Sequence, residues 1–190
     1  MRVSKEQAAK NRDRIIEVAS REFRDKGFDG IGVADLMKSA GLTHGGFYGH
    51  FASKDDLIAE ACAASMDQSA EKWGKLADRS PEEAFAALIN AYLLKEHRDH
   101  RATGCTMAAL APDIARQSGR VRERFTHGTR ALLDILAKII PGVSAEAKRE
   151  KALATMAGLV GTLVLSRAVD DPAFADEILA AGQAAFGKQN

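Results

Sequence analysis

Apolar residues recur at helical spacing along almost the whole chain, and this pattern limits its fold more than any other feature. No stretch alternates apolar and polar residues for long enough to indicate a convincing strand. Helix starts are also marked: Ser4 and Gln7 have capping-box spacing, while Ser80, Pro81 and Glu83 supply a cap, a first-turn proline and a capping-box partner. We therefore expect an all-α protein with about nine helices.

The composition is that of an ordinary globular protein, with 46% hydrophobic and 28% charged residues. The two cysteines, Cys62 and Cys105, are too few for a secreted disulfide framework. Residues 1–20 are charged throughout, and the longest apolar run, Ala157 to Leu165, is far shorter than a bilayer span. We therefore expect a cytoplasmic protein with no signal peptide and no membrane partner.

The stretch GLTHGGFYGHF, residues 41–51, is rich in glycine for a helix, since each interior glycine costs about 1 kcal/mol relative to alanine. It follows a short helical segment from Val33 to Ala40, and Thr43 can cap a second short helix that begins at His44. A helix, a glycine turn and a second short helix form a helix-turn-helix. The sequence thus predicts a DNA-binding domain over residues 1–52 and a second domain over residues 53–190, which opens with a long helix from Lys54 to about Leu76.

Two stretches carry a resemblance to a known family. They are the series Ile15, Ala19, Phe23 and Gly27, and residues 33–57, which read VADLMKSAGLTHGGFYGHFASKDDL. Together they resemble the DNA-binding domain of the TetR family of transcriptional repressors. The resemblance implies a three-helix helix-turn-helix domain followed by a helical bundle for ligand binding and dimerisation, with no catalytic role, no cofactor and no metal. Gly32 and Met37 depart from the family's usual Thr or Ser cap and small alanine, so the two crossed helices are expected to pack slightly differently.

The resemblance also assigns DNA contacts by position. Thr43, Tyr48 and Lys54 would contact phosphates, and His44 would read a base edge. The backbone at Gly45 and Gly46 could approach the duplex closely because neither residue has a side chain. His50 has two open readings, a phosphate contact or a packing residue. The full predicted set is Arg2, Lys5, Thr43, His44, Gly45, Gly46, Tyr48, His50 and Lys54, with Arg2 and Lys5 acting as an arm.

A wide apolar band near the C-terminus predicts a dimer. The band is interleaved with the small residues Ala157, Gly158 and Gly161, and an apolar stripe on both sides of a helix needs two partners. The resemblance makes a twin subunit the second partner. The predicted interface consists of Leu153, Met156, Leu159, Val160, Leu163, Val164, Phe174 and Ile178. A dimer would present two recognition helices about 34 Å apart to a palindromic operator.

Aromatic residues and methionines gather between the predicted DNA-binding domain and the predicted interface. Most of them suit an ordinary core, but in the family a ligand pocket occupies this bundle, and methionines suit an adaptable cavity. The predicted pocket residues are Met66, Trp73, Phe85, Tyr92, Cys105, Met107 and Phe125. A small apolar or amphipathic effector bound there would tilt the long helix and release the protein from DNA.

Two alternatives to a ligand-responsive repressor remain open, a regulator with Cys105 as its sensor and a helical enzyme. Cys105 is either a small buried hydrophobe or a thiol that senses oxidants or electrophiles, which would need exposure and a depressed pKa, with His97, His100 or Arg101 as the source. The third hypothesis is a helical enzyme that uses His97, His100 or His127 as an acid or base, although no nucleophile with a partner and no cofactor loop is evident. His97 and His100 also have the spacing of metal ligands, but no third ligand is evident.

Overall fold

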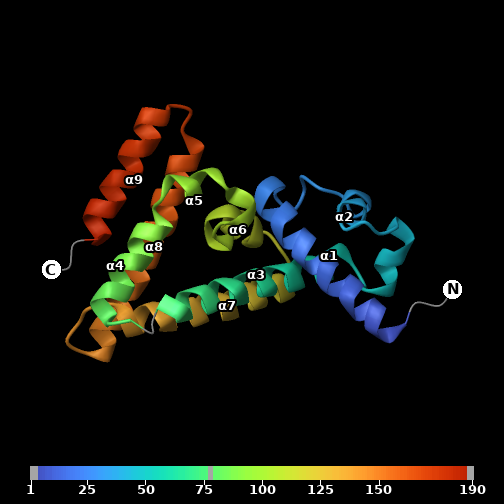
Figure 1. The fold of residues 1–190 in the computed structure, drawn as a ribbon, viewed down its shortest axis with the longest axis horizontal. Helices are drawn as coiled ribbons and strands as arrows, with labels where there is room; N and C mark the ends of the chain where they lie inside the picture. The colour runs from blue at the N-terminus through green and yellow to red at the C-terminus, as the bar shows by residue number, and fades with distance from the viewer. Residues whose placement is uncertain (1–3, 77–78, 188–190) are drawn as a thin grey trace.

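The predicted all-α fold is confirmed. The computed structural model describes residues 4–76 and 79–187, and these residues form helices and turns without any strand (Figure 1). The first three elements are α1 (Lys5–Lys26), α2 (Val33–Ser39) and the 3-10 helix η1 (His44–Gly49). The others are α3 (Lys54–Leu76), α4 (Pro81–Tyr92), α5 (Lys95–Asp99), the 3-10 turn η2 (Arg101–Thr103), α6 (Thr106–Ile114), α7 (Gly119–Ile139), α8 (Ala145–Ala168) and α9 (Pro172–Gly187).

Side-chain caps begin the helices where the sequence predicts them. The Oγ atoms of Ser4, Ser80 and Ser144 accept hydrogen bonds from backbone N–H groups three residues further on, at 3.1, 3.4 and 3.1 Å. Asp171 caps α9 in the same manner through the N–H groups of Ala173 and Phe174. Loss of such a cap costs about 1 kcal/mol.

One predicted cap is wrong. Thr43 occupies the N-cap position of η1, but its side chain makes no capping hydrogen bond. Instead, the N–H of Gly46 bonds to the Thr43 carbonyl oxygen at 3.0 Å, which is the i→i+3 pattern of a 3-10 helix. Glycines at positions 45, 46 and 49 give the segment little tendency to extend into a regular α-helix.

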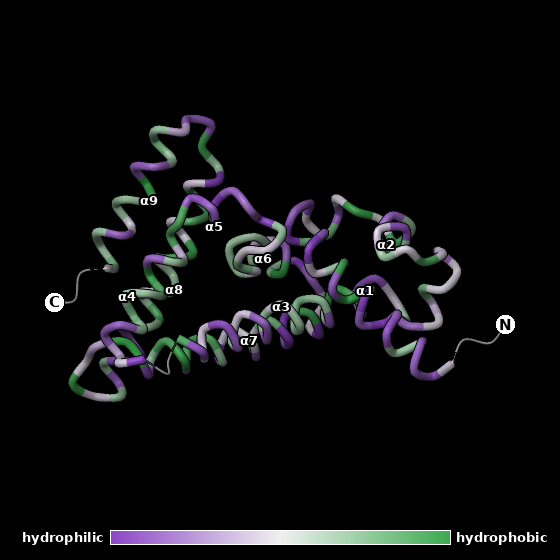
Figure 2. The backbone as a smooth tube through the Cα atoms, viewed as in Figure 1, coloured by the Kyte–Doolittle hydropathy of each residue, from purple (hydrophilic) through white to green (hydrophobic). Residues whose placement is uncertain are grey.

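Two long helices, α3 and α7, lie side by side and join the ends of the molecule (Figure 1). Gly128 on α7 permits their close approach, because a Cβ at that position would lie 2.5 Å from the Cβ of Met66 on α3. The pair α8 and α9 packs beside α4 at one end, and α1 and α2 lie at the other, with α6 between them. Figure 2 shows hydrophobic and hydrophilic residues alternating along α1, α3 and α7, as expected for helices with one face in a core.

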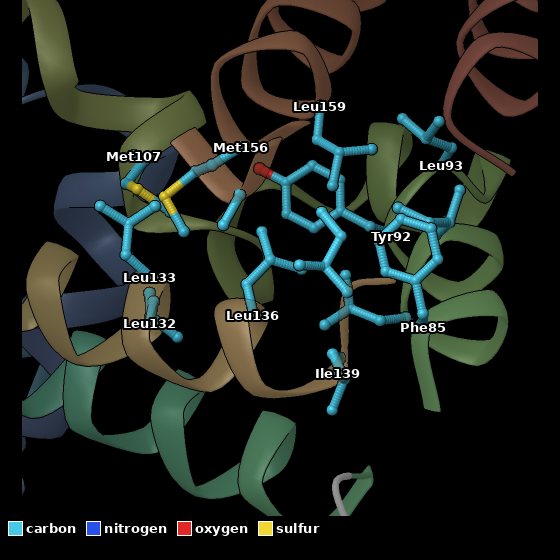
Figure 3. Packing of buried hydrophobic residues seen from close by; sticks show 14 of the residues in the cluster. Phe85, Tyr92, Leu93, Met107, Leu132, Leu133, Leu136, Ile139, Met156 and Leu159 are labelled. Carbon is cyan, nitrogen blue, oxygen red and sulfur yellow. The ribbon is translucent and has the colours of Figure 1, made fainter. Parts of the chain in front are cut away.

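The buried residues form two cores. The C-terminal core joins α4, α7 and α8 through Phe85, Tyr92, Leu136, Met156 and Leu159, among others (Figure 3). The N-terminal core joins α1, α2 and η1, and it also includes Leu57 and Ile58 from the first turns of α3, and Ile114 and Val121. The boundary at residue 52 stays a prediction, and the N-terminal core extends across it.

Within residues 4–76 and 79–187, no helix combines the length and apolar character needed to cross a bilayer.

Candidate functional site

The N-terminal unit consists of α1, α2 and η1, and two phenylalanines hold η1 in place. Phe47 and Phe51 are buried, and their ring centroids lie 5.6 Å apart. Burial of each ring stabilises the fold by roughly 2–3 kcal/mol, which offsets the poor helical propensity of the glycines. Tyr48 points the other way and is 69% exposed, with its ring edge-on to Phe47 at 5.3 Å. Because Phe47 and Phe51 are packed in the core, they hold η1 so that the Tyr48 side chain faces solvent.

The packing beneath η1 explains the departure at Met37. Met37 on α2 is fully buried, and its Cε atom would lie 3.7 Å from a Cβ built at Gly46. The larger side chain thus fills the space below a glycine. Gly41 makes the turn between the two elements with φ of +70°, a conformation that favours glycine.

Five of the nine residues predicted to contact DNA are exposed. Thr43, His44, Gly45 and Tyr48 are exposed on η1, with the His44 and Tyr48 rings 6.4 Å apart, and Lys5 is exposed at the start of α1. A Cβ at Gly45 would meet nothing within 4 Å, so packing inside the subunit does not require glycine there. Gly46 and His50 are half-buried. Arg2 lies outside the described residues.

Lys54 has a partner inside the subunit. Its ammonium group donates a hydrogen bond to the carbonyl oxygen of Phe28, in the turn after α1, which joins the start of α3 to the N-terminal core. Two N–H donors of the ammonium group are left, so its contact with a phosphate stays a prediction. Sequence spacing could not reveal this contact, because Phe28 lies 26 residues away. His50 packs against the ring of Phe51 at 6.4 Å.

A charged network that the sequence did not indicate fixes η1 against the long helices. The guanidinium of Arg12 lies 5.0 Å from the centroid of the Phe51 ring and 2.9 Å from Glu60 Oε1 on α3. Arg120 on α7 pairs with Asp56. A cation over a ring contributes about 0.5–1 kcal/mol at such a site.

A cavity of about 410 Å³ lies between α3, α4, α7 and the segment 97–105. Its lining consists of Met66, Ser69, Lys72, Trp73, Leu76, Leu88, Ala91, Tyr92, His97, Thr103, Gly104, Cys105 and Leu132. Four of the predicted pocket residues are in this set: Met66, Trp73, Tyr92 and Cys105.

The other three predicted pocket residues do not line the cavity. Phe85 and Met107 are buried in the C-terminal core, and Phe125 packs half-buried against both cores. Composition identifies apolar residues but does not separate a cavity wall from a filled core. The missed residues Ser69 and Leu76 stand three and ten positions after Met66, so helical spacing along α3 could have found them.

His97 makes two hydrogen bonds that hold the backbone on one side of the cavity. Its Nδ1 lies 2.6 Å from the carbonyl oxygen of Tyr92, and its Nε2 accepts a hydrogen bond from the backbone N–H of Cys105 at 2.9 Å. These two bonds require the neutral ring with its proton on Nδ1. Burial is the main cause that lowers the pKa of His97 below its usual value.

Two polar atoms next to this part of the cavity are buried, the Tyr92 hydroxyl beside the Cys105 thiol and Arg167 Nη1, which has no hydrogen-bond partner among the described residues. Burial, followed by the neighbouring Cys105 thiol, raises the pKa of Tyr92 well above its ordinary value. Arg167 donates from Nε to the Arg98 carbonyl oxygen at 3.0 Å and from Nη2 to the His97 carbonyl oxygen at 2.6 Å. Arg167 thus supports the same wall from α8.

The predicted dimer residues divide between two faces of α8. Met156, Leu159 and Leu163 are buried in the core of their own subunit, which corrects their assignment to an interface. The apolar band is wide because it covers an inner and an outer face. The outer face carries Leu153, 48% exposed, with Val160 and Val164 half-buried, and α9 adds Phe174, 48% exposed, and half-buried Ile178. Leu165, 58% exposed, belongs to this surface and was not predicted.

Comparisons with known proteins agree with this geometry. The family model described as bacterial regulatory proteins, tetR family, matches residues 15–61. Residues 15–61 therefore match the DNA-binding domain of the TetR family.

A relative of this chain is the transcriptional repressor KstR2 of Mycolicibacterium smegmatis, which is 32% identical over 95 residues, 48% of this chain. The match spans 46% of that relative, so the chain covers less than half of its length. Among solved structures, the reduced form of E. coli NemR gives a TM-score of 0.79 at 17% identity over 93% of this chain and 95% of that one. FadR of Bacillus subtilis in complex with stearoyl-CoA gives 0.61 at 19% identity over 93% and 99%. At these identities the structures establish the fold alone.

The three histidines considered for catalysis lie in different settings. Only His97 lines the cavity, while His100 is exposed with Nδ1 2.8 Å from the Glu96 carbonyl oxygen, and His127 is exposed on α7. In the part of the chain that the structure describes, no three His, Cys, Asp or Glu side chains are grouped so as to hold a metal ion.

Proposed function

We propose that the chain is a homodimeric repressor of the TetR family that acts in the cytoplasm, binds a palindromic operator through η1, and leaves it when a small apolar or amphipathic effector fills the cavity. The observation that carries the proposal is that one segment, residues 102–105, both lines the cavity and contacts α1. Residues Thr103, Gly104 and Cys105 line the cavity, while the flanking Ala102 carbonyl oxygen accepts a hydrogen bond from Arg24 on α1. An effector that moves this segment therefore moves the DNA-binding unit. No catalytic step, metal or cofactor is part of the proposal.

For DNA, the exposed surface on η1 supplies the contacts. Tyr48 and Thr43 bind phosphates, His44 reads a base edge, and the bare backbone at Gly45 approaches the duplex. Lys5 adds a phosphate contact from α1. Because η1 carries few large side chains, part of the sequence preference comes from DNA shape.

For the dimer, the outer face of α8 and the adjoining face of α9 meet their copies in the twin subunit. Leu153, Leu165 and Phe174 are large apolar residues left exposed on this surface, which water would not favour in a lone subunit. Closed two-fold pairing brings two copies of η1 to one side of the duplex, about 34 Å apart.

For release, the effector acts by a population shift. It binds the conformation in which the cavity wall and α3 have moved, and this conformation spaces the two η1 elements wrongly for DNA. A ligand that bound both conformations equally would change nothing. The similar FadR structure was solved with stearoyl-CoA, so a related fold accommodates a ligand with an apolar chain.

To test the proposal, genomic DNA fragments that bind to the full chain are selected. The affinity of the chain for each selected fragment is then measured by fluorescence anisotropy at several salt concentrations. The logarithm of affinity should fall linearly with the logarithm of salt concentration, and the fragment should contain an inverted repeat. A chain that binds no fragment at low salt, or binds all DNA equally, would contradict the proposal. Sedimentation of the same sample tests the dimer separately.

A second candidate function places the sensor at Cys105, and one observation favours it. Cys105 is half-buried in the cavity wall next to the Tyr92 hydroxyl, with the guanidinium groups of Arg24 and Arg167 close enough to influence it. Cys62, in contrast, is buried in the N-terminal core, and burial raises its pKa to about 12. In this alternative, the Cys105 sulfur adds to the carbon–carbon double bond of an electrophile such as N-ethylmaleimide, and the thiol proton ends on the neighbouring carbon. Unchanged release of DNA by N-ethylmaleimide in Cys105→Ser would exclude it.

A further inference from the structure

The effector cavity is unevenly charged. Of the residues that line it, Lys72 is a cation, and none is an Asp or Glu. Lys72 is exposed on α3, and no described residue offers its ammonium group a carboxylate or a hydrogen-bond acceptor. Lys72 lies near His97, because Lys72 and Arg167 both lower the pKa of His97 after the larger effect of burial. The ammonium group is therefore close to the His97 side of the cavity, and no carboxylate of the described residues pairs with it.

A second cation lies behind the same corner. Arg167 forms no ion pair among the described residues, bonds only to two backbone carbonyl oxygens, and keeps Nη1 buried without a partner. The buried Tyr92 hydroxyl lies near Arg167 and interacts with the Cys105 thiol. The cavity thus has Lys72 in its lining and the unpaired Arg167 Nη1 behind it, which is an environment that favours an anion.

Much of the remaining lining is apolar. It includes Met66, Trp73, Leu76, Leu88 and Leu132, and the Trp73 ring lies edge-on to Tyr92 with the centroids 6.3 Å apart. An aromatic or aliphatic group buried against these side chains gains the hydrophobic contribution, while a carboxylate can pair with Lys72.

We infer that the cavity binds a compact amphipathic carboxylate, with its apolar group among Met66, Trp73 and Leu132 and its carboxylate at Lys72. The inference rests on the proposed function, since it names the chemical class of the effector at the same site. A cationic ligand would meet Lys72 and no acidic group in the lining, and an uncharged one would gain no ion pair with the ammonium group. Lys72 also borders a polar cavity between α1 and α3 that contains Asp13 and Glu17, yet it pairs with neither residue.

The test uses 4-phenylbutyrate and its uncharged amide as a matched pair of probes on the full chain. Trp73 is the single tryptophan and lines this cavity, so its fluorescence, excited where neither probe absorbs, reports binding at this place. The carboxylate should bind at least about tenfold more tightly than the amide. Lys72→Met should bring the two affinities within about twofold of each other, while Lys72→Arg should keep most of the preference. Lys75→Met is the control, because Lys75 lies on the same helix outside the cavity lining, and the preference should survive there.

Equal or tighter binding of the amide, no response of Trp73 to either probe, or a preference that survives Lys72→Met would overturn the inference. Operator binding by the same samples separates this result from the proposed function. If the carboxylate binds more tightly but does not change DNA affinity, the cavity is an anion site but not the effector site. If only the amide releases DNA, the cavity is the effector site but does not select an anion.

Discussion

Arg24, on α1, donates a hydrogen bond of 2.8 Å from Nε to the carbonyl oxygen of Ala102 in η2, which joins α1 to the segment that lines the cavity. The same guanidinium donates from Nη1 to Ser65 Oγ, and that oxygen lies 2.5 Å from Thr106 Oγ1. Arg24 is only 5% exposed, and burial lowers its pKa. A buried cation without a carboxylate partner is costly, so these oxygen partners are what keep it in place.

Arg24→Met should therefore lower the free energy of unfolding and weaken the response to an effector. Loss of a charged hydrogen-bond donor that leaves buried oxygens unpaired costs roughly 2–3 kcal/mol, which urea denaturation would measure. DNA affinity without effector should change less than the effector's power to release DNA. Arg21→Met is the control, since Arg21 is exposed one turn earlier on α1 and forms none of these bonds. An effector response as strong in Arg24→Met as in the original chain would show that this contact does not transmit the signal.

Substitutions of Tyr48 and Phe47, two neighbouring aromatic residues on η1, should have different effects on operator affinity and on the free energy of unfolding. Tyr48→Ala should reduce operator affinity by about tenfold or more, equal to about 1.4 kcal/mol, with a change in stability within about 0.5 kcal/mol because the ring is exposed. Phe47→Ala should cost about 3–5 kcal/mol of stability because its ring is buried. Anisotropy and thermal unfolding of both variants test this. If Tyr48→Ala binds the operator normally, the exposed surface on η1 is not the DNA contact.

The outer face of α8 should fail as an interface when it carries charge. Leu153→Glu combined with Leu165→Glu should convert the dimer to monomers in sedimentation velocity runs, and operator affinity should fall with it. Val143→Glu is the matched control, because Val143 is a fully exposed apolar residue in the turn between α7 and α8. A doubly substituted chain that stays dimeric would place the interface elsewhere.

The sequence predicts what depends on local chemistry. Serine caps, the end of α3 and the burial of Phe47 and Phe51 all follow from residue type and short spacing. Met156, Leu159 and Leu163 were misassigned because helical spacing reveals an apolar face but not which of two faces meets the subunit's own core. Contacts between distant residues were also beyond local patterns, as in the bond from Arg24 to Ala102, which spans 78 positions.

The two thiols should differ in reactivity. Under limiting N-ethylmaleimide at pH 7.5, Cys105 should be modified first, since it lines the cavity and Cys62 is buried with a pKa of about 12. A thiol with that pKa is thiolate in fewer than about one in ten thousand molecules at this pH, and thiolate is the nucleophile. Peptide mass spectrometry over time would quantify both sites. Modification of Cys62 ahead of Cys105 in folded protein would contradict the arrangement of the cavity wall.

Acid should loosen the cavity wall through His97. Its pKa in the folded chain is lowered from the ordinary value of 6.5, mainly by burial, so the unfolded chain takes up the proton first as the pH falls. The stability that His97 contributes is therefore complete above about pH 6.5 and is lost as the pH drops from there toward the folded pKa. The loss is at most about 1.4 kcal/mol per pH unit. Protonated His97 can no longer accept the Cys105 N–H, so Trp73 fluorescence should change over the same range. Urea denaturation at pH 7.5 and 5.5 should show a smaller difference in His97→Gln than in the original chain, while His100→Gln, which alters an exposed histidine, should keep the original difference. An identical pH dependence in His97→Gln would mean that this ring does not hold the wall.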